Sequence, residues 1–508
     1  MDLTKEINQH LVKRKVTDVH DEQSIAAEAN LPDYFPEITR VLKCTLEPKI
    51  YAFKNLTEKV LVEGAAEYRV FYLGEENHLR SYTQTIPFQK TMECTLPAEA
   101  FLHAESKTEY VNCRVLLPRK LEIRGAVSIR LLAETLEEQQ ILSDCTGCGT
   151  EIQKETHSIS DLIAYTCVLY PLSETLELSE TKPDILELLR TDADAELQSY
   201  KLISGKILLK GNLLLKVTYI TSQNPQTVES MTYTVPFSQI LELAGAKEKA
   251  FANCRLKISA LDVYPKEDGS GNVRLLDLKV VMGADISVYE EKECTVLLDA
   301  YSTQYDLKIQ NQTVAMLRAK DTIKDTYLLK TKFPLHQPIA KVLSARYGHF
   351  TFTDEIKENV LHIHGELPLE LVLQTPEGEV ECLEHKAKVE YEHAVPMGEN
   401  VAIDVSFVPC GMEYVLNASE HLDLRVEFSM EAFLFAQQLK TVLSSVALSE
   451  QKTETEKYAP LTLYFANAQE TLWNIARHYN TTVLKIQQEN NLQTDILEQK
   501  CTLFIPRA

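Results

Sequence analysis

Apolar and polar residues alternate around one glycine in each third of the chain. The glycines are Gly64, Gly211 and Gly365, and in every copy the residues at positions −4, −2, +2, +4, +6 and +8 are apolar. Strict alternation over these 13 positions predicts a half-buried β-strand, because successive side chains of a strand point to opposite faces. A glycine inside such a strand indicates a bulge or a sharp bend, since it has no Cβ.

A short apolar stub that contains a proline near its start precedes each of these strands. The stubs are 36–42, 183–189 and 337–343, and their apolar residues follow a spacing of i, i+3 and i+4. This spacing predicts a short helix, and proline is compatible with its first turn because the missing N–H is not needed there. Further alternating segments with turn signals between them favour antiparallel sheets. The predicted fold class is mainly β, with three tandem antiparallel β-sandwich-like domains, each preceded by a short helix.

The spacing of the copies and a change of composition divide the chain into domains. The copies are about 150 residues apart, well above the roughly 20–50 residues of a solenoid repeat, which indicates tandem domains. Near the C-terminus, a polar and charged stretch without periodicity reads as a linker. We expect an N-terminal segment 1–30, β domains at 31–150, 151–300 and 301–448, the linker 449–457 and a C-terminal module 458–508.

The C-terminal module has a pattern of its own. Residues 461–465 alternate as a strand, Thr471 stands at an N-cap position, and two helical segments and a closing strand at 502–506 follow. We therefore predict a βααβ module of the α+β class. Its core is expected to contain Leu472, Ile475, Ala476, Tyr479 and Ile505.

Trp473 is the sole tryptophan and lies at the border of the apolar face of the first predicted helix. Two interpretations stay open. The indole is either a partly buried packing residue or an anchor for a partner, a role in which tryptophan is enriched.

Three separated motifs of this module resemble a LysM domain. They are Thr471 to Ala476, Asn490 to Leu492, and the terminal Ile505-Pro506, in that order. The resemblance implies binding of N-acetylglucosamine-containing glycans or of a protein, between the loop 467–470 and the loop 493–495. The family usually has Gly-Asp before Thr-Leu, whereas this chain has Gln469-Glu470, which removes a flexible turn position. The partner- or glycan-binding residues that it implies are Gln469, Glu470, Thr471, Trp473, Asn491, Gln493 and Asp495.

With this module behind three β units, residues 31–508 resemble the SPOCS–LysM family of spore-forming Firmicutes. The resemblance implies a non-enzymatic scaffold of spore envelope and coat assembly. It further implies that the LysM domain docks onto the coat basement ATPase, stage IV sporulation protein A (SpoIVA), at the forespore surface in the mother cell. Other coat or envelope proteins are expected to bind the β units. The alternative is a LysM protein of the cell or spore envelope that binds peptidoglycan.

Composition and charge narrow the classes of partner. The chain is 44% hydrophobic and 25% charged, which is typical of a soluble folded protein. Its net charge of −22, from 52 basic and 74 acidic residues, disfavours nucleic acid and anionic lipid as partners. The N-terminus has no apolar core of signal-peptide length, and no apolar run is long enough for a transmembrane helix. We expect a protein that stays in the cytosol where it is made.

No motif points to catalysis, a cofactor or a metal. Nucleotide-binding loops, an esterase elbow and metalloprotease signatures are missing from the sequence. The eleven cysteines read as reduced thiols, and Cys145 and Cys148 as two incidental thiols in a turn rather than half of a zinc or redox site. His362 and His364 share the polar face of a predicted strand and are expected to be solvated.

Two acidic residues, Asp192 and Asp194, follow the second predicted helical stub. We expect them to lie in a solvated turn. The sequence thus predicts a protein that is not an enzyme and holds neither a cofactor nor a metal ion.

Overall fold

The computed structural model of the protein describes residues 3–75, 78–224, 227–395, 401–417, 421–452 and 461–506. Within these ranges the chain is almost entirely β-strand, and the two helices both belong to the C-terminal module. The predicted fold class, mainly β with a C-terminal α+β module, is confirmed.

The strands repeat one order three times: a long strand, a three-stranded sheet, a fifth strand and a second long strand. The first unit contains β1 (Thr4–Asn30), β2 (Arg40–Asn55), β3 (Lys59–Leu73), β4 (Leu79–Glu93), β5 (Phe101–Leu117) and β6 (Lys120–Thr146). The second contains β7 (Thr150–Glu177), β8 (Ile185–Ile203), β9 (Lys206–Thr221), β10 (Val228–Glu242), β11 (Phe251–Glu267) and β12 (Val273–Ser302).

The third unit differs only in that its second strand is split. It contains β13 (Tyr305–Pro334), β14 (Lys341–Tyr347), β15 (Thr351–Lys357), β16 (Val360–Gln374), β17 (Val380–Ala394), β18 (Val401–Asn417) and β19 (His421–Lys452). Both β14 and β15 pair with β16, where the first two units use one continuous strand. The C-terminal module follows with β20 (Leu461–Ala466), α1 (Leu472–His478), α2 (Val483–Asn490) and β21 (Cys501–Pro506).

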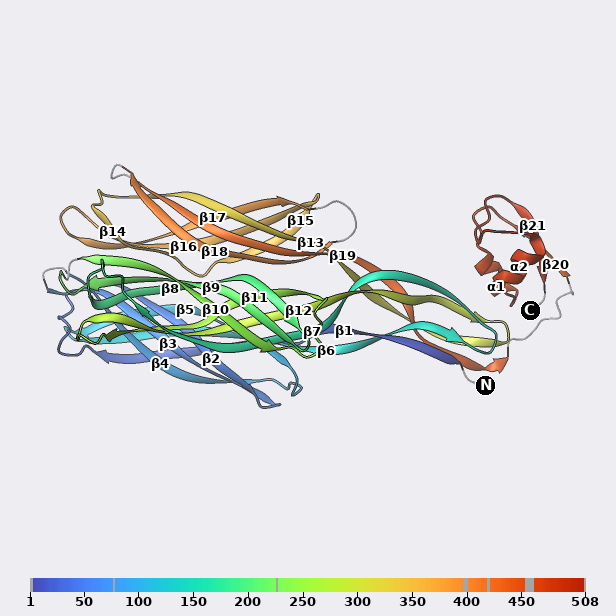
Figure 1. Cartoon of the computed structure of the whole chain (residues 1–508), viewed down its shortest axis with the longest axis horizontal. Helices are drawn as coiled ribbons and strands as arrows, with labels where there is room; N and C mark the ends of the chain where they lie inside the picture. Colours follow the sequence, from blue (N-terminus) through green and yellow to red (C-terminus); the bar gives the residue numbers. More distant parts are fainter. Residues whose placement is uncertain are drawn as a thin grey trace.

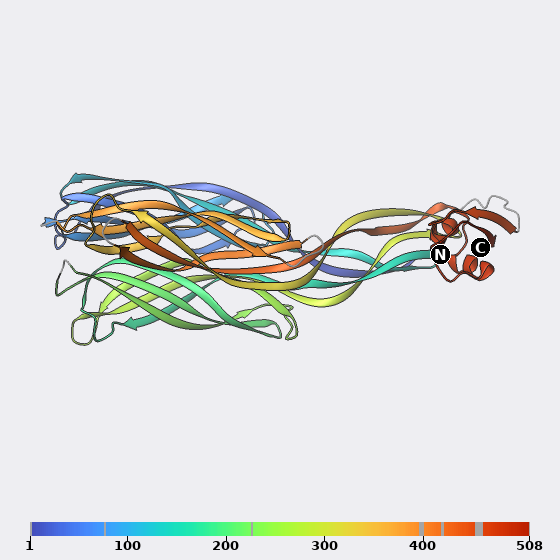
Figure 2. The ribbon, with the colours of Figure 1, turned by 90° about the horizontal axis from the view of Figure 1, so that it is seen from above.

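The long strands pair within each unit and continue beyond the heads as a common stalk (Figure 1). β1 pairs antiparallel with β6, β7 with β12, and β13 with β19. The stalk core is apolar and takes residues from all three units, among them Ile141, Ile159, Val296, Val314 and Val442. Figure 2 shows the same extended stalk from above, with the heads gathered at one end and the C-terminal module at the other.

The strand pairing bears on where the domains begin. Residues 1–30, set apart from the sequence as an N-terminal segment, contain β1, which pairs with β6 from Thr4↔Thr146 to Asn30↔Lys120. We therefore propose units of 4–146, 150–302 and 305–452. The linker expected at 449–457 overlaps the end of β19, and residues 453–460 lie outside the described residues.

Each head is a sandwich of the three-stranded sheet and one half of the long-strand pair. Every inward position predicted around the three glycines is buried. These residues are Val60, Val62, Ala66, Tyr68, Val70, Tyr72, Ile207, Leu209, Leu213, Leu215, Val217, Tyr219, Leu361, Ile363, Leu367, Leu369, Leu371 and Leu373. They pack against inward residues of β6, β12 and β19, so the period-two pattern does mark the core face.

The glycines allow a close approach of neighbouring strands. A Cβ at Gly211 would collide with the carbonyl oxygen of Glu196 and with the ring of Phe237, and Gly64 is enclosed in the same way by Lys49 and Phe88. In both units the bulge lies in the adjacent strand beside the glycine, at Ile50/Ala52 and at Leu197/Ser199. The glycine therefore accommodates a bulged neighbour and an aromatic ring from the other side.

The short helices predicted before each domain are wrong. The stubs lead into β2, β8 and β14, and each of these strands has a register shift that skips one residue: Leu42, Leu189 or Leu343. Such a bulge changes the spacing of same-face residues from i, i+2 to i, i+3, which is the spacing that we interpreted as helical.

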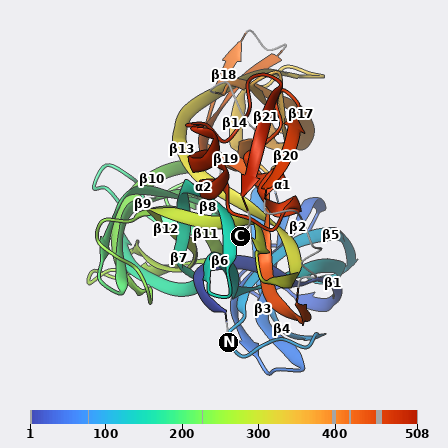
Figure 3. The same ribbon diagram turned by 90° about the vertical axis from the view of Figure 1, so that its right-hand side faces the viewer.

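The three bulge leucines meet at the centre of the heads. Leu189 and Leu343 are buried in one cluster with Phe71, Ile220 and Val372, and Leu42 packs against it. Figure 3 shows the three lobes arranged around a common centre. This cluster joins the three heads into one body because each unit contributes apolar residues to it.

Candidate interaction site on the C-terminal module

The C-terminal module has its own small core. Leu472, Ile475, Ala476 and Ile505 are buried in one cluster, and Tyr479 packs against it. Thr471 caps α1 by accepting a hydrogen bond from the Asn474 N–H at 3.4 Å. The residues that we expected to form the core therefore lie together, beneath the two-stranded sheet of β20 and β21.

Asn490 connects α2 to the sheet. Its side-chain amide donates to the carbonyl oxygens of Ile486 at 2.8 Å and Phe504 at 2.7 Å, and its Oδ1 accepts from the Phe504 N–H at 2.7 Å. The Asn490 side chain thus bonds the backbone N–H and carbonyl of Phe504 as a neighbouring strand would. The adjacent Asn491 ends α2 in the left-handed conformation, at φ 54°.

The two loops that were expected to form a groove lie side by side. The Gln469 N–H donates to the Leu497 carbonyl at 2.7 Å, and the Leu472 N–H donates to the Asp495 carbonyl at 2.8 Å. Gln469, Gln493 and Asp495 are exposed in these two loops, and Asn491 is exposed at the end of α2, just before the second loop. The structure therefore brings the two predicted loops together.

The Glu470 side chain forms hydrogen bonds within its own module. Its carboxylate accepts hydrogen bonds from the Tyr464 hydroxyl at 2.6 Å and from the Asn467 N–H at 2.9 Å. These two bonds lower the pKa of Glu470. Gln469 adopts φ +68° at the position where the sequence lacks the glycine usual for a LysM domain.

Trp473 does not line the seam between the loops. It is half-buried, and its indole N–H donates to Asp299 Oδ2 on β12 at 2.9 Å. Its ring meets the ring of Tyr301 edge-on, at 4.8 Å between centroids and an interplanar angle of 70°. The indole is therefore placed against the stalk of the same chain.

The outer face of the two-stranded sheet carries large apolar side chains, which the sequence analysis did not single out. Leu463, Phe465 and Phe504 are 54%, 76% and 43% exposed. Leu463 lies opposite Phe504, and Phe465 is two residues further along β20, on the same face of the sheet. The alternation of β20 was recognised, but its apolar side faces outward, because Ala466 on the other side is the residue that packs on the helices. We call these three residues the apolar sheet face.

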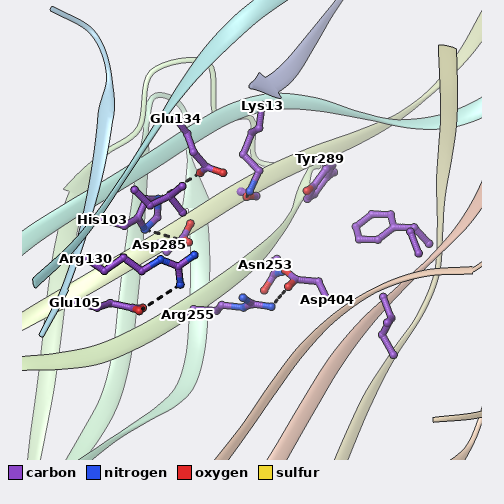
Figure 4. Close-up of a pocket in the computed structure, with 15 residues that line it drawn as sticks. Lys13, His103, Glu105, Arg130, Glu134, Asn253, Arg255, Asp285, Tyr289 and Asp404 are labelled. Atoms are coloured by element: carbon purple, nitrogen blue, oxygen red, sulfur yellow. Dashed lines mark hydrogen bonds and ion pairs between the residues drawn. The ribbon is translucent and has the colours of Figure 1, made fainter. Parts of the chain in front are cut away.

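Two polar clusters outside this module were not expected from the sequence. One lines a cavity of about 480 Å³ where the three units meet, shown in Figure 4. Lys13, His103, Arg130 and Arg255 face Glu105, Glu134, Asp285 and Asp404 there. Although burial alone would lower it, hydrogen bonds to Cys167 and Glu134 raise the pKa of His103 to about 10. The cavity thus holds four positive and four negative groups, a balanced set.

The second cluster is buried in the stalk. His10 Nδ1 lies 2.9 Å from Asp161 Oδ1, and His10 Nε2 lies 3.3 Å from Cys294 Sγ. A thiol, an imidazole and a carboxylate in this order occur in nucleophilic catalysis. Here Cys294 has no exposed surface, so no substrate can reach its sulfur. The arrangement is a structural hydrogen-bond network.

The structure also places the histidines and cysteines that we considered as metal ligands. Leu361 and Ile363 are buried while the neighbouring His362 and His364 point to the other face of β16, as expected. Cys145 is buried in the stalk, and Cys148 lies in the turn after β6. In the part of the chain that the structure describes, no three His, Cys, Asp or Glu side chains gather as metal ligands would.

The solvated turn expected for Asp192 and Asp194 is wrong. Both lie in β8 at the junction of the heads, where Arg190 Nε donates to Asp192 at 2.7 Å and the Tyr347 hydroxyl donates to Asp194 at 2.8 Å. Burial raises the pKa of Asp194 to about 6. Separately, no helix within the described ranges is long and apolar enough to cross a lipid bilayer.

Comparison with protein families agrees with this architecture. The family model "SipL, SPOCS domain" matches residues 37–116 and 184–265, and the LysM domain model matches residues 468–506. No curated protein and no solved structure matches the chain. The third unit lies outside the matched segments but repeats the strand order of the first two. The chain therefore combines SPOCS domains of the SipL type with a C-terminal LysM domain.

Proposed function

We propose that the protein is a non-enzymatic scaffold of spore envelope and coat assembly. It docks through its LysM domain onto a coat morphogenetic ATPase of the SpoIVA kind, at the forespore surface in the mother cell. SPOCS and LysM domains support a sporulation-related binding protein. The SpoIVA-like partner is the one that the resemblance to the SPOCS–LysM family implies.

The apolar sheet face is the observation that supports a protein as the binding partner. Leu463, Phe465 and Phe504 form a contiguous exposed patch, whereas the contact residues predicted from the sequence are polar apart from Trp473. Exposed apolar clusters with a polar rim are typical of protein–protein contacts, and aromatic residues are enriched in their centres. Gln469, Gln493 and Asp495 are candidates for polar contacts on the seam between the loops.

Point variants of the full chain test this docking. We expect Phe465→Ser to weaken binding of a purified SpoIVA-like ATPase by about fivefold or more, because the loss of a central aromatic contact typically costs over ~1 kcal/mol. The fold should be unaffected, since the side chain is 76% exposed. Surface plasmon resonance with the immobilised ATPase measures the affinity.

Leu484→Ser is the matched control. Leu484 is 61% exposed on α2, and its loss removes a similar apolar side chain without touching the apolar sheet face. Equal affinity of the wild-type chain and the Phe465→Ser variant would show that the ATPase does not use this face.

Glycan binding is the second candidate. The observation in its favour is that the loops 467–470 and 493–495 lie side by side and exposed, as a LysM sugar groove requires. Calorimetric titration of the full chain with chitin oligomers and muropeptides tests it. Heat of binding that is lost in Gln493→Ala but retained in Phe465→Ser would favour the sugar.

A further inference from the structure

At the tip of the stalk, two side chains point away from the stalk core and contact the C-terminal module. Asp299 and Tyr301 are near the end of β12, two residues apart, so they share one face of the strand. A register shift between Leu297 and Asp299 places a β-bulge directly before them. Bulges redirect the side chains that follow, and Leu297 and Ala300 remain in the stalk core.

The LysM domain presents a matching pair. Trp473 and Arg477 are four residues apart in α1 and therefore lie on one side of the helix. Asp299 Oδ2 accepts hydrogen bonds from both, at 2.9 Å from the Trp473 indole and at 2.6 Å from Arg477 Nη1. The bond from Arg477 is charge-assisted, which makes it the stronger kind.

Tyr301 enters the LysM core. Although it belongs to the stalk, it is only 5% exposed and clusters with Leu472, Ile475 and Leu503 of the module. Its hydroxyl donates to the carbonyl oxygen of Thr481 at 2.8 Å, and its ring packs edge-on against Trp473. The polar end and the apolar ring of Tyr301 are thus both satisfied by the module.

We infer that the tip of the stalk is a docking site for the LysM domain of the same chain, with Asp299 and Tyr301 as the contact residues. The interface is small, but both partners belong to one polypeptide. A short tether raises the effective concentration to the order of millimolar, so even a weak contact stays occupied.

In this docking, Trp473 contacts a partner within the same chain. The apolar sheet face remains available for contact with another protein. Leu463, Phe465 and Phe504 remain exposed while the module is docked. If the proposed function holds, the stalk presents the LysM domain with this face free for the coat ATPase. The docking itself does not depend on that function.

Fluorescence of the full chain tests the docking, because Trp473 is its only tryptophan. We expect Asp299→Ala to raise quenching of the tryptophan emission by acrylamide about twofold, as the indole loses its cover when the contact opens. Arg477→Ala should act in the same direction. The double variant should add little, since both changes break one contact.

Asp306→Ala is the control, because Asp306 is an exposed aspartate on the neighbouring strand β13. Hydrogen exchange provides the second readout, with faster exchange of the amides at 472–478 in Asp299→Ala and Arg477→Ala but not in Asp306→Ala. Unchanged quenching and exchange in both Asp299→Ala and Arg477→Ala would overturn the docking. If Asp299→Ala still binds the ATPase, the proposed function stands whatever the result for the docking. The effect of Phe465→Ser on ATPase binding tests the proposed function and not the docking to the stalk.

Discussion

At the scale of single residues, buried polar side chains hold the stalk together. His10 is 6% exposed, and its imidazole is enclosed by Asp161 and Cys294, with Lys292 Nζ at 2.5 Å from the other oxygen of Asp161. The hydrogen bonds to Asp161 and then to Cys294 raise the pKa of His10 from 6.5 to about 9. The folded stalk therefore favours the charged imidazolium, which joins β1 to β7 and β12.

This shift predicts a pH dependence of stability. Because the pKa is higher in the folded chain than in the unfolded one, the stabilisation is complete below pH 6.5 and is lost as the pH rises through about 9. Its upper bound is roughly 3 kcal/mol, from about 1.4 kcal/mol per pKa unit. Urea unfolding at pH 6.5 and pH 9.5 should show a lower midpoint at the higher pH.

His10→Gln isolates this contribution. Glutamine can still donate to Asp161 but does not titrate, so the difference between the two pH values should shrink. His103, whose pKa hydrogen bonds raise to about 10, and Glu187, whose pKa burial raises to about 7, act in the same direction and are present in both proteins. An unaltered pH difference in His10→Gln would rule out the imidazolium as its source.

At the scale of elements, two neighbouring asparagines have different structural roles. Asn490 makes three hydrogen bonds that tie α2 to β21, whereas Asn491 only ends the helix in the left-handed conformation. We expect Asn490→Ala to destabilise the LysM domain by about 1–3 kcal/mol, because it leaves backbone groups of Phe504 without their partner. Thermal unfolding followed by Trp473 emission measures this effect.

Asn491→Gly serves as the comparison, since glycine adopts the left-handed conformation without strain and is common at helix ends. Its unfolding temperature should stay near that of the wild type. Similar losses in both variants would mean that Asn490 is not a bridge between the helix and the strand.

The pattern of the strands was readable from the sequence, but their bulges were not. The inward positions around Gly64, Gly211 and Gly365 follow from period-two alternation, because a strand buries every second residue. An inserted residue such as Leu189 breaks that alternation and imitates helical spacing over a short stub. The outward orientation of Leu463 and Phe465 also depended on which side the helices cover, and alternation alone does not specify the side.

At the scale of the whole molecule, pairing between distant segments determines the shape. The contact of Trp473 with Asp299 joins residues 174 positions apart, and β1 pairs with β6 from Thr4↔Thr146 to Asn30↔Lys120. Local propensity carries no signal for such contacts, so neither the stalk nor the docking of the LysM domain could be predicted. The LysM domain itself was recognisable, because its three motifs lie within one short segment.

The arrangement separates two ends of one elongated body (Figure 1). Three heads, two of which the SPOCS model matches, share the central apolar cluster at one end, and the LysM domain lies at the other. Under the proposed function, this form would let the chain join an anchored protein to further coat components across its length, because two modest contacts on one chain add up to a stable tether.

The most direct measurement is affinity capture from sporulating cells with the full chain and with a chain that ends at residue 452. Both versions retain the three heads and the stalk, and circular dichroism should show the same strand content. We predict that the full chain retains a SpoIVA-like ATPase and that the shortened chain loses it. Equal recovery of the ATPase by both chains would contradict docking through the LysM domain.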